Sequence, residues 1–385
     1  MSPNGSERYD IVVIGGGAVG LAAACAAVGR GKSVVVLEQF DLLHNRGSSG
    51  GDERQWRMQY SEEDLARLTV DSVGLWKDLE DRGGRRLVHR TGSLWFGDTT
   101  TSTNEGQVTG AAEVLDRVGL PYRWLSAKQI EQEYHFARLP GTYEGFFQPD
   151  GGMVDVRGTL WLLLELAQAG GARVRTGERV RELITGLGPI EIVSETARYL
   201  ADYVVVAAGA FANDLLAPLG IALELKLFEM TTAYFETADH GFDYPTWFAF
   251  QAPTEQDSNL FYGFGRRPWA PGNLAKVGPD FELKELHSPA LANGTVDQYQ
   301  LDRTVGWVGE HLPGLDPHPV GASSCLIALP RDHERQFYVG PVPGHERIVV
   351  YSSGWGFKFV PLLGRACVQL LLDGKTEYNI SRSYL

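Results

Sequence analysis

Cysteine is scarce in this chain of 385 residues, which contains three, Cys25, Cys325 and Cys367. Their odd number and wide spacing argue against a disulfide framework, and since no Cys-x-x-Cys pair occurs, the sequence predicts no metal site. No apolar run reaches the roughly 18 residues that would indicate a membrane span. The first ten residues are polar and lack the pattern of a signal peptide. We therefore expect a cytoplasmic protein with no membrane partner.

Positive charge is also in short supply, because 35 Lys and Arg residues stand against 48 Asp and Glu residues, for a net charge of −13. This balance argues against nucleic acid and anionic membrane surfaces as the main partners. Hydrophobic residues make up 43% of the chain and aromatic residues 11%, so a well-packed interior is expected. The length suits one large domain or two intertwined domains.

The most informative motif lies near the N-terminus. Residues 9–14 (YDIVVI) form an apolar, β-branched run typical of a strand buried on both faces. The sequence GGGAVG follows at 15–20, then a segment of small apolar residues, and then a second strand at 33–37 (SVVVL). This order of strand, glycine loop, helix and strand predicts a βαβ unit that binds a dinucleotide.

Each glycine of the loop has a separate role in that prediction. Gly15 permits the tight turn, Gly17 lets the backbone approach a pyrophosphate, and Gly20 lets the helix pack closely on the strand. The first helical residues, Ala18 and Val19, present N–H groups to the phosphates at the positive end of the helix dipole.

The choice between FAD and NAD depends on further positions. Glu38 ends the second strand, 23 residues after Gly15, where an acid binds a ribose hydroxyl in either case. The extreme N-terminal position of the motif favours FAD. Residues 203–214 (YVVVAAGAFAND) predict a later strand that ends in a turn of small residues. The backbone near Gly209 is therefore expected to approach the same dinucleotide.

The remaining pattern mixes helices with β-rich segments. Helices are predicted near 61–79, 105–118, 127–134, 156–169, 295–311 and 357–372, and strands near 92–97, 173–176, 178–184, 203–207, 336–340 and 347–351. Residues 222–264 are β-rich, whereas 144–155 are turn-rich and 265–294 loop-like. We predict an α/β fold of two domains. A Rossmann-like FAD-binding domain comprises 1–85, 155–220 and 320–385, and a β-rich substrate domain comprises 86–154 and 221–319.

Several segments together carry a family resemblance. The N-terminal unit, GSSGGDERQWRMQY (47–60), SSCLIALPRDHERQFYVG (323–340) and SSGWGFKF (352–359) resemble the monomeric sarcosine oxidase family of FAD enzymes with covalently bound flavin. Within that family, GSLWFGDT (92–99), QPDGG (148–152), NLFYGFG (259–265) and GPDF (278–281) resemble the piperideine-2-carboxylate oxidases of nikkomycin-type antibiotic pathways. The resemblance spans essentially the whole chain and implies a monomer.

The resemblance implies a set of flavin contacts. Cys325 resembles the cysteine that bonds to the flavin 8α-methyl group through sulfur, although a lone cysteine is more often a small buried hydrophobe. Arg54 resembles an arginine beside the flavin ring, whose charge would stabilise the anionic reduced flavin. Cys25 and Cys367 are interpreted as packing residues. The other expected contacts are Gly47, Ser48, Ser49, Val180, Gly354, Gly356 and Lys358.

The resemblance also implies a substrate site. Arg57 and Lys358 resemble the pair that binds the substrate carboxylate, which orients the reacting bond toward the flavin. Lys276 falls where the family places a basic residue that helps oxygen react, but an exposed loop lysine is an equal alternative. Trp355 replaces a histidine of the sarcosine-type relatives and could stack on a flat ring.

Three further residues belong to the expected site. Tyr262 could donate a hydrogen bond to the substrate, or could be one of many core aromatics. Glu105 and Asp280 lie in shared motifs, and either carboxylate could accept a proton from the substrate. Both could equally be surface acids.

These features predict oxidation of a cyclic imino acid, with piperideine-2-carboxylate converted to picolinate. The conversion removes four hydrogens, so it needs two O₂ molecules and yields two of hydrogen peroxide. The alternative is a two-electron oxidase of L-pipecolate, sarcosine or another N-alkyl amino acid. A flavin-binding module without turnover and an NAD-dependent dehydrogenase are the remaining possibilities. The expected partners are therefore a small cyclic amino or imino acid and O₂.

Overall fold

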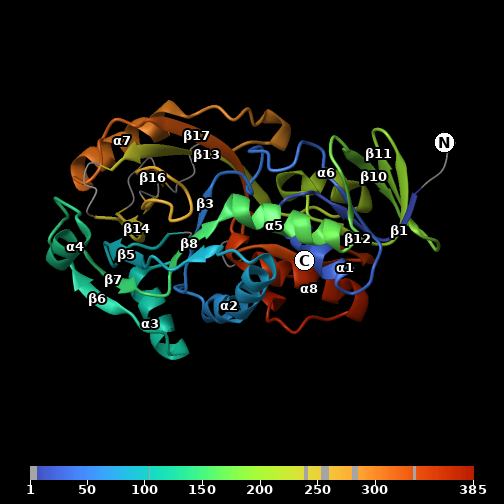
Figure 1. The fold of residues 1–385 in the computed structure, drawn as a ribbon, viewed down its shortest axis with the longest axis horizontal. Coiled ribbons are helices and arrows are strands. Elements are labelled where there is room, and N and C mark those ends of the chain that lie inside the picture. Colours follow the sequence, from blue (N-terminus) through green and yellow to red (C-terminus); the bar gives the residue numbers. More distant parts are fainter. Residues whose placement is uncertain (1–6, 104, 238–241, 253–259, 280–284, 333–334) are drawn as a thin grey trace.

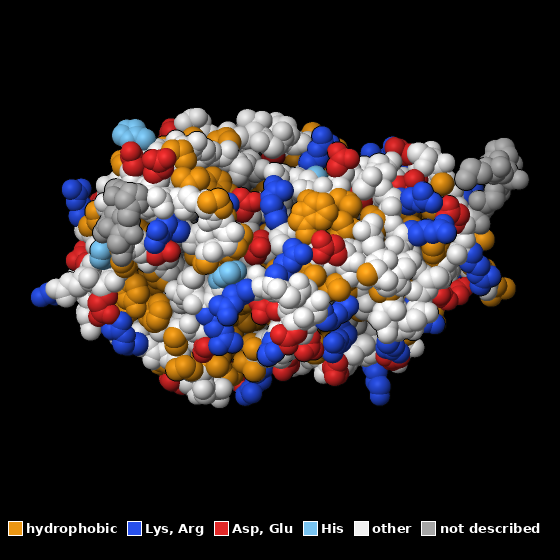
Figure 2. Space-filling view, in the orientation of Figure 1, with side chains coloured by type: hydrophobic (Ala, Val, Ile, Leu, Met, Phe, Trp, Pro, Cys, Tyr) orange, Lys and Arg blue, Asp and Glu red, His pale blue; other side chains and the backbone are white. Residues whose placement is uncertain are grey.

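A computed structural model describes residues 7–103, 105–237, 242–252, 260–279, 285–332 and 335–385 of the chain. Two large sheets lie toward opposite ends of an elongated molecule, with a small third sheet between them (Figure 1). Acidic, basic and hydrophobic side chains are interspersed over the face shown in Figure 2. Within the described ranges, no helix is long and apolar enough to cross a membrane.

The first large sheet contains the N-terminal strand. Its strands run in the order β10-β11-β12-β1-β2-β9, and β19 pairs with both β12 and β18. The pairs β1–β2, β1–β12, β2–β9 and β12–β19 are parallel. The bounds are β1 (Glu7–Ile14), β2 (Val34–Leu37), β9 (Arg173–Arg175), β10 (Val180–Ile184), β11 (Ile190–Ser194), β12 (Arg198–Val206), β18 (Tyr338–Val342) and β19 (His345–Ser352).

Successive side chains of β1 point into two different apolar clusters, so this sheet is buried on both faces. Ile11 and Val13 pack with α1 (Ala18–Val28), α5 (Val156–Ala169) and α8 (Val360–Asp373) in one apolar cluster. Val12 and Ile14 point the other way, into a second cluster that includes residues of α6 (Ala212–Leu216). Successive side chains of a strand point to opposite faces, so an unbroken apolar run suits a sheet covered on both sides. The predicted α/β class is confirmed.

The second large sheet has the strand order β17-β13-β16-β15-β14-β5-β7-β6. One face packs an aromatic cluster, with Trp247 and Phe261 against Trp307 of α7 (Gln298–His311). The bounds are β5 (Ser93–Gly97), β6 (Arg123–Ser126), β7 (Glu144–Gln148), β13 (Leu225–Glu236), β14 (Thr246–Phe250), β15 (Leu260–Phe264), β16 (Leu274–Pro279) and β17 (Gly321–Pro330).

The third sheet is small and joins the two parts of the molecule. It contains β3 (Glu53–Trp56), β8 (Gly152–Asp155) and β4 (Val88–His89), in the order β3-β8-β4. The helices α2 (Glu63–Gly83), α3 (Val108–Val118) and α4 (Ala127–Tyr134) complete the list of the longer helices described. Because β3 follows the glycine-rich loop at 47–51, it brings that loop to the boundary between the two large sheets.

Two of the secondary-structure predictions were wrong. Residues 144–155, expected to be turns, contain β7 and β8, and residues 265–294, expected to be loop-like, contain β16. Strand β16 reads LAKVGP and has few of the β-branched residues that mark a strand, while its Gly278 and Pro279 are typical of turns. Its pairing with β13 and β15 stabilises it instead.

Candidate active site

The glycine loop between β1 and α1 has the close contacts that its spacing predicts. Gly15 has a φ of +105°, and a Cβ there would lie 2.4 Å from the carbonyl oxygen of Ala207, the residue that follows strand β12. A Cβ on Gly20 would lie 2.0 Å from the Gly15 carbonyl oxygen. Glycine is therefore required at Gly15 for conformation and at Gly20 for the contact between helix and strand.

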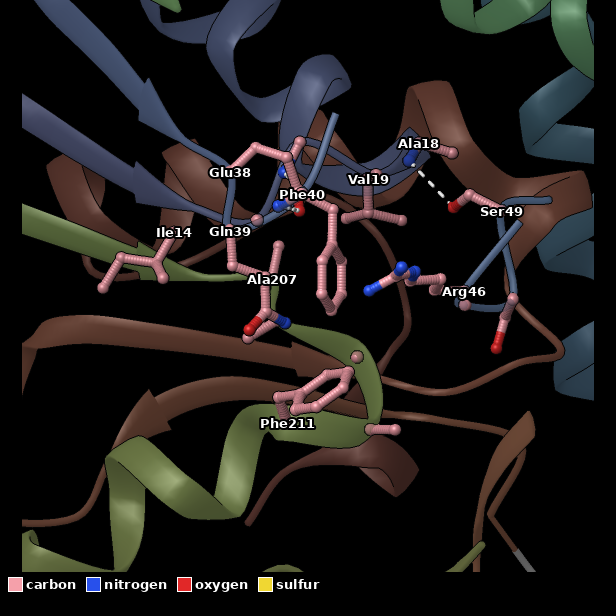
Figure 3. Close-up of a pocket in the computed structure, with 18 of the residues that line it drawn as sticks. Ile14, Ala18, Val19, Glu38, Gln39, Phe40, Arg46, Ser49, Ala207 and Phe211 are labelled. Atoms are coloured by element: carbon pink, nitrogen blue, oxygen red, sulfur yellow. Dashed lines mark hydrogen bonds between the residues drawn. The ribbon is translucent and has the colours of Figure 1, made fainter. Parts of the chain in front are cut away.

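The Glu38 carboxylate lies against this loop and is 5% exposed. Its Oε2 accepts a hydrogen bond from Gly16 N at 2.7 Å, and its Oε1 accepts one from Phe40 N at 2.9 Å. Glu38 thus fixes the loop conformation as well as standing at the position predicted for a ribose contact. Nearby, Ser49 Oγ accepts from Ala18 N at 3.1 Å, which ties the 47–51 loop to the start of α1 (Figure 3).

A cavity of about 420 Å³ opens beside the loop. Phe40 and Arg46, which sequence reasoning missed, lie in it with the Arg46 guanidinium 4.8 Å above the Phe40 ring, and Phe211 lies across from them (Figure 3). Gly20 and Gly356 pack outside it, whereas Arg54, Cys325 and Lys358 belong to a second cavity. The predicted residues that line the first cavity are Gly15, Gly17, Ala18, Val19, Glu38, Gly47, Ser48, Ser49, Val180, Gly209 and Gly354.

Replacing Gly20 by alanine should destabilise the protein by about 1–3 kcal/mol, because overpacking would push α1 away from β1. Flavin content after purification should fall as well, since the loop depends on that contact. Gly74→Ala is the matched control, because Gly74 lies within α2 and a Cβ there would meet nothing within 4 Å. That variant should be as stable as the parent or slightly more so. Denaturant unfolding of both proteins checks the prediction, and equal stabilities would contradict it.

The second cavity, of about 290 Å³, lies between the two large sheets. It shares Gly354 and Phe357 with the first cavity, so the two adjoin. Asp280 lies outside the described residues. All other predicted catalytic residues line this one cavity, although they come from segments far apart in the chain: Arg57, Glu105, Tyr262, Lys276, Trp355 and Lys358.

Arg57 is the most buried cation of the cavity, with a residue exposure of 1%. Its Nη1 forms an ion pair with Glu105, which is 6% exposed and so is not a surface acid. Burial alone would lower the pKa of Arg57, but the Glu105 carboxylate and the Tyr60 hydroxyl raise it overall. Arg57 Nε and Nη2 have no hydrogen-bond partner among the described residues. Its guanidinium therefore stays charged and has donors available for an anion.

Tyr60 connects Arg57 to the second cation, Lys358. The guanidinium carbon of Arg57 lies 4.5 Å from the centre of the Tyr60 ring, and Lys358 Nζ lies 5.7 Å from it. Lys358 Nζ also donates to the Trp355 carbonyl at 3.4 Å, and Trp76 Nε1 donates to the Lys358 carbonyl at 2.7 Å. Tyr60 was not predicted, because nothing in the local sequence separates it from a core aromatic.

Lys276 lies in strand β16 and is 7% exposed, so the alternative of an exposed loop lysine is wrong. Its Nζ lies 3.3 Å from Glu53 Oε1.

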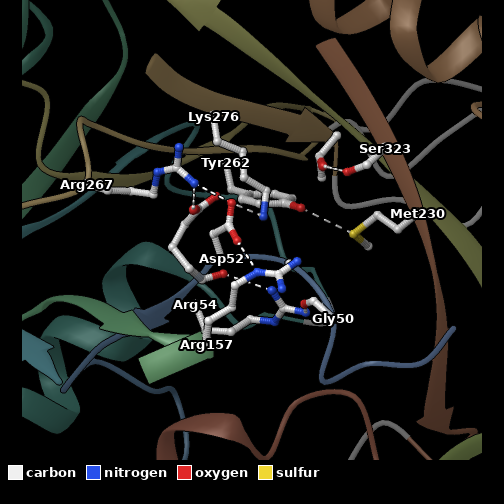
Figure 4. Close-up of polar contacts among 12 residues, drawn as sticks. Gly50, Asp52, Arg54, Arg157, Met230, Tyr262, Arg267, Lys276 and Ser323 are labelled. Carbon is white, nitrogen blue, oxygen red and sulfur yellow. Dashed lines mark hydrogen bonds and ion pairs between the residues drawn. The ribbon is translucent and has the colours of Figure 1, made fainter. Parts of the chain in front are cut away.

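Arg54 donates to the carbonyls of Ser48 at 2.7 Å and Gly50 at 2.6 Å (Figure 4). It thereby ties the 47–51 loop to β3 at the point where the two cavities adjoin.

Cys325 and Tyr262 line the same cavity from the second sheet. Cys325 lies on β17 opposite Met230 of β13 and is partly exposed. The Tyr262 hydroxyl donates to Met230 Sδ at 3.5 Å (Figure 4). In contrast, Cys25 and Cys367 are buried in apolar clusters, and burial raises the pKa of each thiol to about 12.

The two cavities fit the two ends of FAD. Gly17, the N-cap of α1, and the first residues of the helix line the first cavity, so the positive end of the helix dipole faces the place where a phosphate would bind. A Cβ on Gly354, where the cavities adjoin, would lie 2.9 Å from Ile327 Cγ2 and 3.2 Å from Ser48 Oγ. Glycine at this position therefore lets the backbone pack closely on Ile327 and Ser48 where the two cavities adjoin.

A parallel sheet with a glycine loop, joined to a cation-lined cavity, defines a dinucleotide-dependent oxidoreductase. The chain belongs to the FAD dependent oxidoreductase family, whose family model matches residues 10–370. It is 33% identical to a "Putative bifunctional amine oxidase" of Dictyostelium discoideum over 97% of this chain, but spans 36% of that longer protein. It is 27% identical to the monomeric sarcosine oxidase of Bacillus sp. strain B-0618, over 98% of this chain and 95% of that one.

Among solved structures, the open form of NikD matches with a TM-score of 0.94 and 49% identity, over 98% of each chain. NikD is described as an unusual amino acid oxidase essential for nikkomycin biosynthesis. These matches confirm the resemblance to the monomeric sarcosine oxidase family, the fold class, FAD as the cofactor and a flavin-dependent amine oxidase as the enzyme class.

Proposed function

We propose that this protein oxidises a cyclic imino acid, piperideine-2-carboxylate, to picolinate as a step in antibiotic biosynthesis. The reaction transfers four hydrogens from the ring in two rounds, and each round reduces one O₂ to hydrogen peroxide. We further propose a monomeric cytoplasmic protein whose FAD is bonded to Cys325 through sulfur. The likeness to NikD at 49% identity supports the choice of pathway.

One observation carries the proposal: two buried cations and an indole line a single cavity that adjoins the dinucleotide cavity. Arg57 and Lys358 suit a carboxylate, because the Arg57 guanidinium has donors available and Lys358 adds a second positive charge. Trp355 offers a flat apolar surface to the ring of the substrate. Held at its carboxylate, the substrate presents its C–N edge in one orientation.

The remaining residues of the cavity have proposed roles in this reaction. Bound FAD would supply the two-electron redox chemistry that links the substrate to O₂. The Glu105 carboxylate neutralises Arg57 when no substrate is bound and can accept a proton from the substrate. Tyr262 positions the substrate ring from the β-sheet side, and Lys276 supplies positive charge where O₂ becomes reduced. Asp280 is retained as a second proton acceptor.

A substrate comparison tests the proposal. We expect kcat/KM for piperideine-2-carboxylate to exceed that for sarcosine by at least about tenfold, because a linear amine leaves the contact with Trp355 unmade. Peroxide release, with two equivalents per picolinate, measures both turnover and electron number. Sarcosine oxidised rapidly, with no turnover of the cyclic imine, would overturn the proposal.

The second candidate is a two-electron oxidase of L-pipecolate, sarcosine or another N-alkyl amino acid. Similarity to the Bacillus sarcosine oxidase over nearly the whole chain favours it. The same assay separates the candidates, since a two-electron reaction yields one peroxide per substrate and no aromatic product absorbing in the ultraviolet.

A further inference from the structure

Lys276 and Glu53 form an ion pair inside the protein, away from solvent. Glu53 is 1% exposed and Lys276 is 7% exposed, and their charged atoms lie 3.3 Å apart. They come from different parts of the fold, since Glu53 begins β3 of the small sheet and Lys276 lies in β16 of the large one. Burying two charges costs desolvation free energy that their mutual attraction can fail to repay. A buried pair of this kind is therefore better explained by a function than by stability.

The groups around Lys276 come from each neighbouring element. Arg54 follows Glu53 on β3, Cys325 lies on β17, and Tyr234 is the partner of Lys276 in the register of β13. The Phe264 ring of β15 lies 5.2 Å from Lys276 Nζ. Arg267 Nη1 lies 3.8 Å from Glu53 Oε2. The same guanidinium also pairs with Asp52 (Figure 4).

Glu53 is the carboxylate within ion-pair distance of Lys276 in the described part of the chain. Burial lowers the pKa of Lys276, and the Arg54 charge lowers it further, whereas the Glu53 carboxylate raises it. Without Glu53, burial and Arg54 would both favour the neutral amine. A neutral amine would supply no positive charge to the cavity.

We propose that Glu53 is a positioning residue that holds the Lys276 ammonium in place and charged at the wall of the substrate cavity. This inference rests on the proposed role of Lys276 in oxygen reduction. The oxygen half of the reaction would then depend on Glu53, whereas substrate binding at Arg57 and Lys358 would not. Glu53 contacts Lys276 and Arg267, and it does not line the cavity itself.

The first test measures reoxidation of the reduced flavin by O₂ in rapid-mixing experiments from pH 6 to pH 10. Photoreduction with EDTA prepares the reduced protein, so this measurement does not depend on the substrate. Lys276→Met should slow reoxidation by about 10²-fold, the scale of one lost electrostatic contact. In Glu53→Gln, reoxidation should be no slower than in the parent at low pH. Above the pKa that Lys276 has in this variant, reoxidation should slow by about tenfold for each pH unit.

Two further variants separate this role from a structural one. Glu53→Asp keeps the negative charge and should restore the parental pH profile. Asp81→Asn removes the acid of an exposed pair with Lys77 and should change nothing, because both side chains are more than 60% exposed, at 70% and 63%. A parental pH profile in Glu53→Gln would overturn the inference.

The second test is independent of flavin turnover and uses the pH dependence of unfolding. A lysine whose folded pKa is lowered binds fewer protons when folded than when unfolded, so stability rises with pH between the two pKa values. This rise should begin at lower pH and be larger in Glu53→Gln than in the parent. It should disappear from the double variant Glu53→Gln/Lys276→Met. Equal slopes in all three proteins would overturn the inference.

The outcomes distinguish this inference from the proposed function. Anaerobic reduction by piperideine-2-carboxylate should remain at the parental rate in Glu53→Gln. Loss of substrate reduction in the parent itself would defeat the proposed function alone, because photoreduced protein still reports on Glu53. Unchanged reoxidation in Lys276→Met would remove the oxygen role of the lysine and overturn this inference with it.

Discussion

Substitution of Arg57 by alanine is expected to raise the KM for the cyclic imino acid by about 30-fold to several thousandfold. The range corresponds to a loss of about 2–5 kcal/mol when one partner of a buried charge pair is removed. Arg57 is 1% exposed and three aromatic rings lie within 6 Å of its guanidinium carbon, at 4.5, 5.3 and 5.6 Å. Water is therefore a poor substitute for the Arg57 guanidinium as a partner of the substrate carboxylate.

The control for this prediction has to account for Glu105. Removing Arg57 also removes the ion-pair partner of a carboxylate that is 6% exposed, so the single variant can lose stability for that reason. The double variant Arg57→Ala/Glu105→Gln removes both charges and should regain stability while keeping the high KM. Arg117→Ala, at an exposed pair with Glu63, should leave KM unchanged.

Steady-state kinetics with the cyclic imine, together with denaturant unfolding of each variant, measure the two effects separately. A KM in Arg57→Ala within twofold of the parent would remove Arg57 from the carboxylate site. A parental KM in the double variant would instead show that Glu105, rather than the lost contact, had disturbed binding. In either case Lys358 would become the main carboxylate partner.

The N-terminal unit was predicted well because its signals are local. The strand, the glycine loop and the helix follow one another without interruption, and the contacts of Gly15 and Gly20 lie within that unit or on the adjacent strand. Helix α5 coincides with the predicted residues 156–169 for the same reason, since its apolar positions repeat at helical spacing.

The interior of the active site could not be predicted from local pattern. Glu53 and Tyr60 flank the predicted Arg57 in sequence, yet nothing in their spacing indicates that one meets Lys276 and the other lies between two cations. The contacts of Glu53 with Lys276 and of Tyr60 with Lys358 join residues more than 200 positions apart, so they follow from the packing of the 53–60 segment between the two large sheets. Resemblance to a family supplied Arg57, Lys276 and Lys358, whereas physical reasoning alone left each open.

Lys276 is a residue whose local sequence suggests the wrong environment. Its surroundings in sequence, with several Pro and Gly residues between 265 and 294, are typical of an exposed loop. The strand exists because its neighbours β13 and β15 supply hydrogen-bond partners on both sides. Tertiary pairing of this kind overrides local propensity, and it converts an apparent surface lysine into a buried one.

Replacement of Cys325 by alanine is expected to change flavin attachment completely, from fully retained to fully released when the protein is precipitated with acid. A bond to the flavin methyl group needs a sulfur atom that reaches the cavity. Cys325 lines the substrate cavity and is partly exposed. Lys276 and Arg54 line the same cavity as Cys325.

The other two cysteines are the matched controls. Cys25→Ala and Cys367→Ala should both keep flavin in the precipitate, because each thiol is buried in an apolar cluster with a pKa of about 12 and does not line either cavity. Cys25 Sγ also donates to the Leu163 carbonyl at 2.9 Å, which fixes it in the packing of α1 against α5. Cys325→Ser should behave as Cys325→Ala does, since it keeps the size of the side chain and loses the sulfur.

Absorbance of the acid supernatant at the flavin maximum, with the intact mass of each protein, measures attachment directly. Flavin that stays with the Cys325→Ala chain would place the linkage at another residue, and flavin released from the parent would show that it is bound by the cavities alone.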